Sequence, residues 1–88
     1  MNSQRTIEVT LIGRAGCHLC EAARDEVLAA QTLTTFNLVE WDVDSDPELR
    51  SEYGEQVPVV LVDGQMHSFF EVDRELLAQA VAAAKSPG

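Results

Sequence analysis

Cysteine is scarce in this chain: its 88 residues include only two, too few for the disulfide scaffold of a small secreted domain. Basic side chains are also few, since six Lys and Arg stand against 15 Asp and Glu and give a formal charge of -9. Nucleic-acid backbones and anionic membrane surfaces need clustered cations, so we expect neither as a partner. The longest clean apolar run after residue 12, Val59–Val62, is too short to cross a bilayer, and no signal-type stretch follows residues 1–6. We therefore predict a cytoplasmic protein.

The length fits a single domain, which we expect to span residues 1–88 with an ordered core over about 7–85. Alternating and β-branched residues predict strands, and apolar residues at helical spacing predict helices. The resulting β-α-β-α-β-β-α order predicts an α/β protein with a four-stranded mixed sheet flanked by three helices. The expected strands are 7–12, 36–43, 59–62 and 65–70, and the expected helices are about 17–31, 46–54 and 74–85.

The helical patterns also predict which side chains are buried. Leu19, Ala23 and Val27 recur at a spacing of four, so we expect them on the inner face of the first helix. Leu76 is expected to point inward from the last helix. Gly54 is expected to end the short helix in the left-handed conformation.

The aromatic residues and two acidic residues are interpreted first as structural. Trp41 and the pair Phe69-Phe70 are expected to pack in the core and along the sheet edge. If either phenylalanine is instead exposed beside the cysteines, the pair would form a patch for a protein substrate. Asp73 is expected to cap the last helix, and Glu8 to face solvent near the start of the first strand.

The two cysteines stand at the head of the first predicted helix, in Cys17-His18-Leu19-Cys20, directly after a strand and a glycine-containing turn. Cysteines at positions i and i+3 lie on one face of a helical turn, close enough to be joined. The free N–H groups and the dipole at a helix N-terminus favour a thiolate over a thiol. This pattern predicts a nucleophile, Cys17, and a built-in partner that releases it, Cys20. The alternative is that both are small buried apolar side chains.

With these residues in view, the chain resembles a glutaredoxin, within the thioredoxin-like fold, over about residues 7–85. The resemblance depends on the Cys-x-x-Cys pair after the first strand, on Val57-Pro58 before the third strand, and on Asp63-Gly64 at the hairpin. The chain is most similar to a glutaredoxin-like branch with Gly-Cys-His-Leu-Cys after strand one and Tyr-Gly followed by Val-Pro-Val before strand three.

The resemblance implies roles for particular positions. The Val57-Pro58 bond would be cis and would turn the backbone of Val57 toward the sulfurs, where a substrate can pair with it. Arg14 matches the basic residue that glutaredoxins place near the glutathione carboxylate, and Gln56 stands where many glutaredoxins have threonine. The expected substrate-binding residues are Arg14, His18, Gln56, Val57 and Pro58.

Two departures from the glutaredoxin pattern concern glutathione. His18-Leu19 replaces the usual Pro-Tyr or Pro-Phe, and Phe69-Phe70 stands in the region where glutaredoxins hold a glutathione carboxylate with Gly-Gly. Glutathione is also anionic, like the whole chain. We expect no bound cofactor, and glutathione is a candidate electron donor that these departures disfavour.

The predicted function is that of a dithiol–disulfide oxidoreductase acting on a protein or small-molecule disulfide, with glutathione or a thioredoxin system as reductant. His18 is either an imidazolium that stabilises the thiolate or a solvated surface side chain. Two other classes stay open: a metal or iron–sulfur cluster protein, and a thioredoxin-fold adaptor without turnover. Tetrahedral zinc takes four ligands, and beyond the motif only His67 remains, on a distant strand, so we assign no metal ligand. We expect a monomer, while the edge strand 65–70 leaves dimers open.

Overall fold

The structure of the protein is a computed structural model, which describes residues 6–85; the ends of the expected domain, 1–5 and 86–88, lie outside the described residues. The elements follow the predicted order, with one added 3₁₀ turn, η1, between the second strand and the second helix. They are β1 (Glu8–Gly13), α1 (His18–Leu33), β2 (Asn37–Asp42), η1 (Val43–Ser45), α2 (Pro47–Tyr53), β3 (Val59–Val62), β4 (Gln65–Phe69) and α3 (Arg74–Lys85).

The sheet has four strands in the order β2-β1-β3-β4, which confirms the predicted mixed sheet. β1 and β2 are parallel, as a strand–helix–strand unit requires, whereas β3 is antiparallel to both β1 and β4. The hairpin turn contains Asp63 and Gly64, whose φ angles of 53° and 84° are the positive values that a two-residue turn needs. The arrangement places the C-terminal end of β1 in the middle of the sheet, where the Cys-x-x-Cys segment begins.

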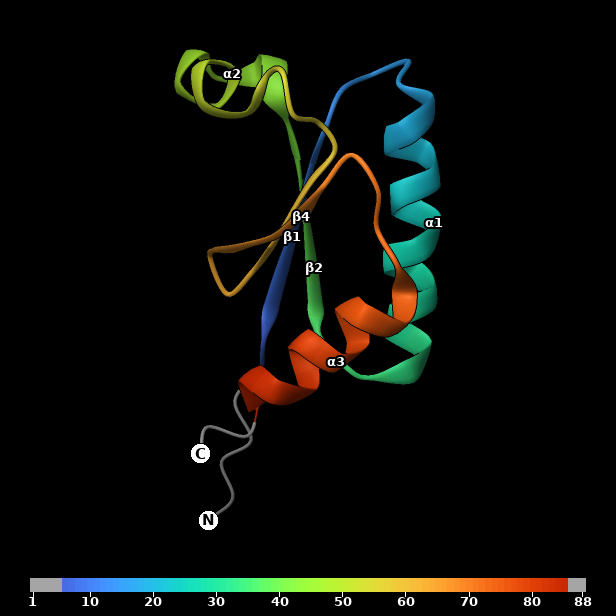
Figure 1. Cartoon of the computed structure of the whole chain (residues 1–88). Coiled ribbons are helices and arrows are strands. Elements are labelled where there is room, and N and C mark those ends of the chain that lie inside the picture. The colour runs from blue at the N-terminus through green and yellow to red at the C-terminus, as the bar shows by residue number, and fades with distance from the viewer. Residues whose placement is uncertain (1–5, 86–88) are drawn as a thin grey trace.

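Helices cover both faces of the sheet. α1 and α3 pack together on one face (Figure 1). Val27 of α1 and Leu77 of α3 are fully buried there with Val9 of β1. α2 packs on the other side, where Leu49 and Tyr53 contact a smaller cluster of buried aliphatic residues. This two-sided burial explains why the sequence of β3 has no polar face.

Three expectations about side chains and turns are wrong. Leu19 is 51% exposed, because it lies in the first turn of α1, before the stretch from Ala23 onward that reaches the core; Leu76 is 58% exposed beside the buried Leu77. Gly54 has a φ of -57°, in the right-handed region. A Cβ on Gly54 would lie 2.5 Å from the carbonyl oxygen of Arg50, so close backbone approach explains this glycine.

Aspartate side chains start both shorter helices. The Asp73 carboxylate accepts the N–H groups of Glu75 and Leu76 at 2.8 and 3.0 Å, which confirms the predicted cap of α3. Asp46 caps α2 in the same way and precedes a proline at the first helical position.

Within residues 6–85, no helix combines the length and the apolarity needed to cross a membrane.

Candidate functional site

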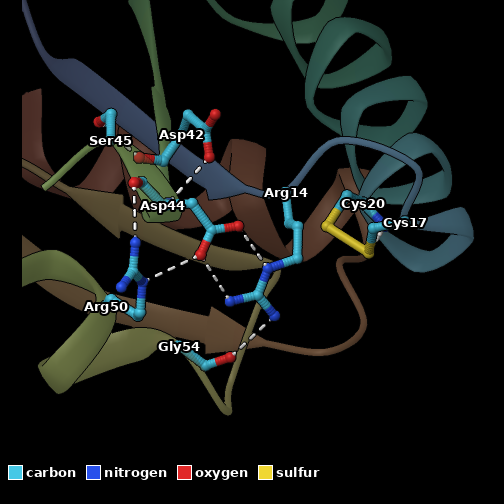
Figure 2. A network of polar contacts seen from close by, with 8 residues as sticks. All are labelled: Arg14, Cys17, Cys20, Asp42, Asp44, Ser45, Arg50 and Gly54. Carbon is cyan, nitrogen blue, oxygen red and sulfur yellow. Dashed lines mark hydrogen bonds and ion pairs between the residues drawn. A yellow bond between two sulfur atoms is a disulfide. The ribbon is translucent and has the colours of Figure 1, made fainter. Parts of the chain in front are cut away.

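The Cys-x-x-Cys pair is presented by the turn between β1 and α1. Gly16 has a φ of 76°, and Cys17 follows in an extended conformation as the N-cap of α1. The Cys17 Sγ atom accepts the backbone N–H of Cys20 at 3.1 Å, so the sulfur takes the place of the oxygen that usually caps a helix. The Cα atoms of the two cysteines lie 5.1 Å apart and their sulfurs form a disulfide (Figure 2). The predicted proximity of the two sulfurs at a helix N-terminus is therefore confirmed.

The two cysteines differ in exposure. Cys20 is 9% exposed, whereas Cys17 is only half-buried at the helix end. Gly13, the last residue of β1, lies directly beneath Cys20, and an added Cβ there would be 3.3 Å from both its Cβ and its Sγ atoms. Sequence reasoning missed this role of Gly13; the available signal was a glycine where the strand meets the cysteine-bearing turn. Cys17 is therefore the more exposed of the two cysteines.

Arg14 is engaged by acidic and backbone groups of other segments. Its Nε and Nη2 atoms donate to the two carboxylate oxygens of Asp44 at 2.8 and 3.1 Å, and Nη1 donates to the carbonyl of Gly54 at 3.3 Å. Arg50 donates to the Asp44 carboxylate from the other side at 3.2 Å. Figure 2 shows the Arg14 side chain extending toward Asp44 and Gly54 rather than toward the disulfide.

This contact has a clear electrostatic signature. The hydrogen bond from Arg14 lowers the pKa of the Asp44 carboxyl, and the same contact raises the pKa of Arg14. An anionic ligand at Arg14 would have to compete with the Asp44 carboxylate. Sequence reasoning did not identify Asp44, because the two residues lie 30 positions apart and no local pattern joins them.

A hollow of about 310 Å³ lies beside the disulfide. Both cysteines line it, together with Trp41 of β2 and the Arg24–Glu40 ion pair, whose Nε and Oε1 atoms are 2.9 Å apart. Trp41 is exposed, so the expectation that it packs in the core is wrong. The reason is its position on β2, an outer strand of the sheet. Glu8 is exposed at the far end of β1, as expected.

The other predicted binding residues occupy different surroundings. His18 is exposed in the first turn of α1, next to Cys17. The Val57–Pro58 bond is cis, as the resemblance implies, and Pro58 is fully buried. Val57 packs against the smaller core cluster. Gln56 lines a separate hollow that also includes Phe69 and Phe70, and that hollow does not include the cysteines.

Phe69 and Phe70 are exposed, at 45% and 43%, so the expectation that they pack along the edge is wrong. The backbone N–H of Phe70 donates to the carbonyl of Pro58 at 2.8 Å, which ties the end of β4 to the loop before β3. Residues 6–85 of one chain contain no group of three or more His, Cys, Asp and Glu side chains able to hold a metal ion. His67 lies in a different hollow, between β4 and α3, and burial lowers its pKa.

The fold and the site define a protein of the thioredoxin-like class with a disulfide-forming Cys-x-x-Cys pair at the N-terminus of its first helix. Comparison with known proteins agrees. A thioredoxin from Halobacterium salinarum is similar in structure, with a TM-score of 0.71 and 20% identity, and the match covers 93% of this chain and 77% of the thioredoxin chain. This similarity shows the shared fold. An X-ray structure of the structural genomics target protein XcR50 from X. campestris is also similar, with a TM-score of 0.71 and 28% identity. The match covers 85% of this chain and 96% of the XcR50 chain.

The family is established by sequence. The family model described as "Glutaredoxin-like domain (DUF836)" matches residues 8–82, and the chain belongs to this family. An uncharacterized protein of Mycobacterium tuberculosis H37Rv is 36% identical over 80 residues, which cover 85% of this chain and 82% of that relative.

Proposed function

We propose that this protein is a dithiol–disulfide oxidoreductase whose reacting groups are Cys17 and Cys20. The observation that supports it best is the pair of sulfurs at the N-terminus of α1, one half-buried and one covered. A helix N-terminus favours thiolate over thiol, and the thiolate is the species that attacks a disulfide.

The reaction divides into two exchanges. The Cys17 thiolate attacks one sulfur of a substrate disulfide, forms a mixed disulfide and expels the other substrate sulfur as a thiolate. The Cys20 thiolate then attacks the Cys17 sulfur, expels the second substrate thiolate and leaves the Cys17–Cys20 disulfide. Two electrons pass from the protein to the substrate, and an external thiol returns them by the same exchanges in reverse.

The surroundings of the pair favour this order of events. The covered position of Cys20 under the turn suits a sulfur that reacts within the molecule, and Gly13 leaves space for it. Because Asp44 holds Arg14, the turn offers glutathione no free guanidinium at this position. We therefore expect a reductant other than glutathione to be the efficient donor.

Trapping of the mixed disulfide tests this proposal. A Cys20→Ser variant lacks the resolving thiol, so its Cys17 should accumulate a mixed disulfide with hydroxyethyl disulfide, visible as one added mercaptoethanol mass. The matched Cys17→Ser variant should accumulate far less, because its remaining thiol is covered. Equal labelling of both variants, or none in either, would overturn the proposed roles.

A further inference from the structure

An exposed aromatic pair stands at the end of β4. The rings of Phe69 and Phe70 pack edge to face with centroids 5.0 Å apart, and nearly half of each side chain is open to solvent. The segment after β4, orange in Figure 1, passes between the start of α1 and α2. Contiguous exposed apolar side chains of this kind mark interaction sites on soluble proteins.

The backbone holds this pair at an energetic cost. Phe70 has a φ of 69°, which is a genuine outlier for a bulky residue. The N–H of Glu71 donates to the carbonyl of Phe69 at 2.8 Å and closes a three-residue turn around Phe70, while the Phe70 N–H is held by Pro58. Such conformations cluster at ligand clamps. The fold thus accepts a strained turn and gains an exposed ring rather than a buried one.

The pair is continuous with the cysteine motif. A hollow of about 320 Å³ is lined by Phe70, by Val72 and by Leu19, the exposed residue immediately before Cys20. A second hollow, on the side toward α2, is lined by both phenylalanines and Gln56. Phe70 therefore forms a ridge between the two hollows. We call the exposed side chains of Leu19, Phe69 and Phe70 the aromatic ridge.

The charges around the aromatic ridge are mostly negative. Glu71 lines the first hollow, and Glu52 and Glu55 line the second. None of the three forms an ion pair with a described residue, whereas the other charged side chains of these hollows, Arg50 and Glu26, are paired with Asp44 and Arg74. A ligand on the ridge therefore meets apolar surface bordered by three carboxylates that form no ion pair within residues 6–85 and by Arg50, which shares the Asp44 carboxylate with Arg14.

We propose that the aromatic ridge binds the cysteine-bearing segment of a protein disulfide, one with an apolar side chain beside its cysteine and Lys or Arg nearby. This inference rests on the proposed function, because the ridge acts only if Cys17 exchanges with the bound disulfide. The apolar side chain would cover the rings, and the cations would face the three carboxylates. Oxidised glutathione is anionic and has no apolar side chain to place there.

Matched peptide disulfides test the inference. Two peptides of equal length carry one cysteine as a mixed disulfide with mercaptoethanol; one has leucine and lysines beside the cysteine, the other serine and aspartates. Each rate of reduction by the reduced protein is divided by the rate of the same protein on hydroxyethyl disulfide. We expect a preference of about tenfold or more for the leucine–lysine peptide, since one partly buried apolar side chain supplies that much.

Variants assign the preference to the ridge. Phe70→Gly, which suits the positive φ, and Phe69→Ser should each lower the preference severalfold, leaving the part that the three carboxylates contribute. The control Leu33→Ala, which removes an equally exposed apolar side chain at the other end of α1, should keep it. If hydroxyethyl disulfide is not reduced at all, the proposed function fails. If it is reduced but the peptides react equally, or Phe70→Gly and Phe69→Ser retain the full preference, only the aromatic ridge is wrong.

Discussion

At position 70 we expect the glycine variant to be more stable than the alanine variant, which is the reverse of the order at an ordinary position. At most positions Gly is less stable than Ala by about 0.5–1 kcal/mol, because it loses more chain entropy on folding. At the φ of 69° found for Phe70, a residue with a Cβ pays about 1–2 kcal/mol that Gly does not. The difference predicts that Phe70→Gly is the more stable variant, by about 0.5–1 kcal/mol.

Phe69 supplies the matched control, because it lies in β4 and is not among the residues with positive φ. There, Phe69→Ala should be more stable than Phe69→Gly by about 0.5–1 kcal/mol. The four free energies of unfolding come from urea titrations of the oxidised proteins, with equal m-values as the condition for comparison. If alanine exceeds glycine at position 70 by the same margin as at 69, the strained turn, and the reasoning that the ring is held there at a cost, are refuted.

Three further predictions concern the core, the turn and the ion pair. Leu77→Ala should lower the free energy of unfolding by about 2–5 kcal/mol, because the side chain is fully buried between α3 and the sheet; a loss below about 1 kcal/mol would contradict its burial. Gly13→Val should cost about 1–3 kcal/mol in the same assay, since its Cβ would already lie 3.3 Å from the Cys20 Sγ atom; an unchanged urea midpoint would mean the sulfur is not packed there. The contact with Arg14 lowers the pKa of Asp44 in the folded protein. The ion pair therefore stabilises the fold fully above the pKa of Asp44 in the unfolded chain, about 4, and this stabilisation is lost as the pH falls through the lower pKa of the folded protein. Asp44→Asn should thus be less stable than the wild type at neutral pH and converge with it in acid; a constant difference would contradict the ion pair.

The order and type of the elements were predictable because local signals agree with the fold. The alternation in β1, the apolar run of β3, the Asp63-Gly64 turn and the Asp73 cap each specify local structure without knowledge of distant contacts. The position of Cys17 at the start of α1 was predictable for the same reason. These parts of the site depend on residues close together in the chain.

The remaining features of the fold and the site depend on contacts between segments that are distant in the sequence. A helical pattern marks Leu19 as inward, but it does not reveal that the contacts of α1 with the main core cluster begin only at Ala23. The partner of Arg14, Asp44, comes from a segment after β2, so the ion pair that holds the Arg14 guanidinium is visible only in the tertiary structure. The exposure of Phe70 likewise follows from a turn with positive φ, and the residue type there argues against such a turn.

The redox equilibrium of the Cys17–Cys20 pair tests the central claim most directly. The protein is equilibrated in buffers of graded dithiothreitol ratio, free thiols are alkylated, and the mass of the intact protein gives the oxidised fraction. The account predicts one reversible two-electron transition, reached from either side, with both cysteines alkylated together and the fold retained in both states. A pair that stays reduced in fully oxidising buffer, or that is reduced only when the protein unfolds, would contradict it.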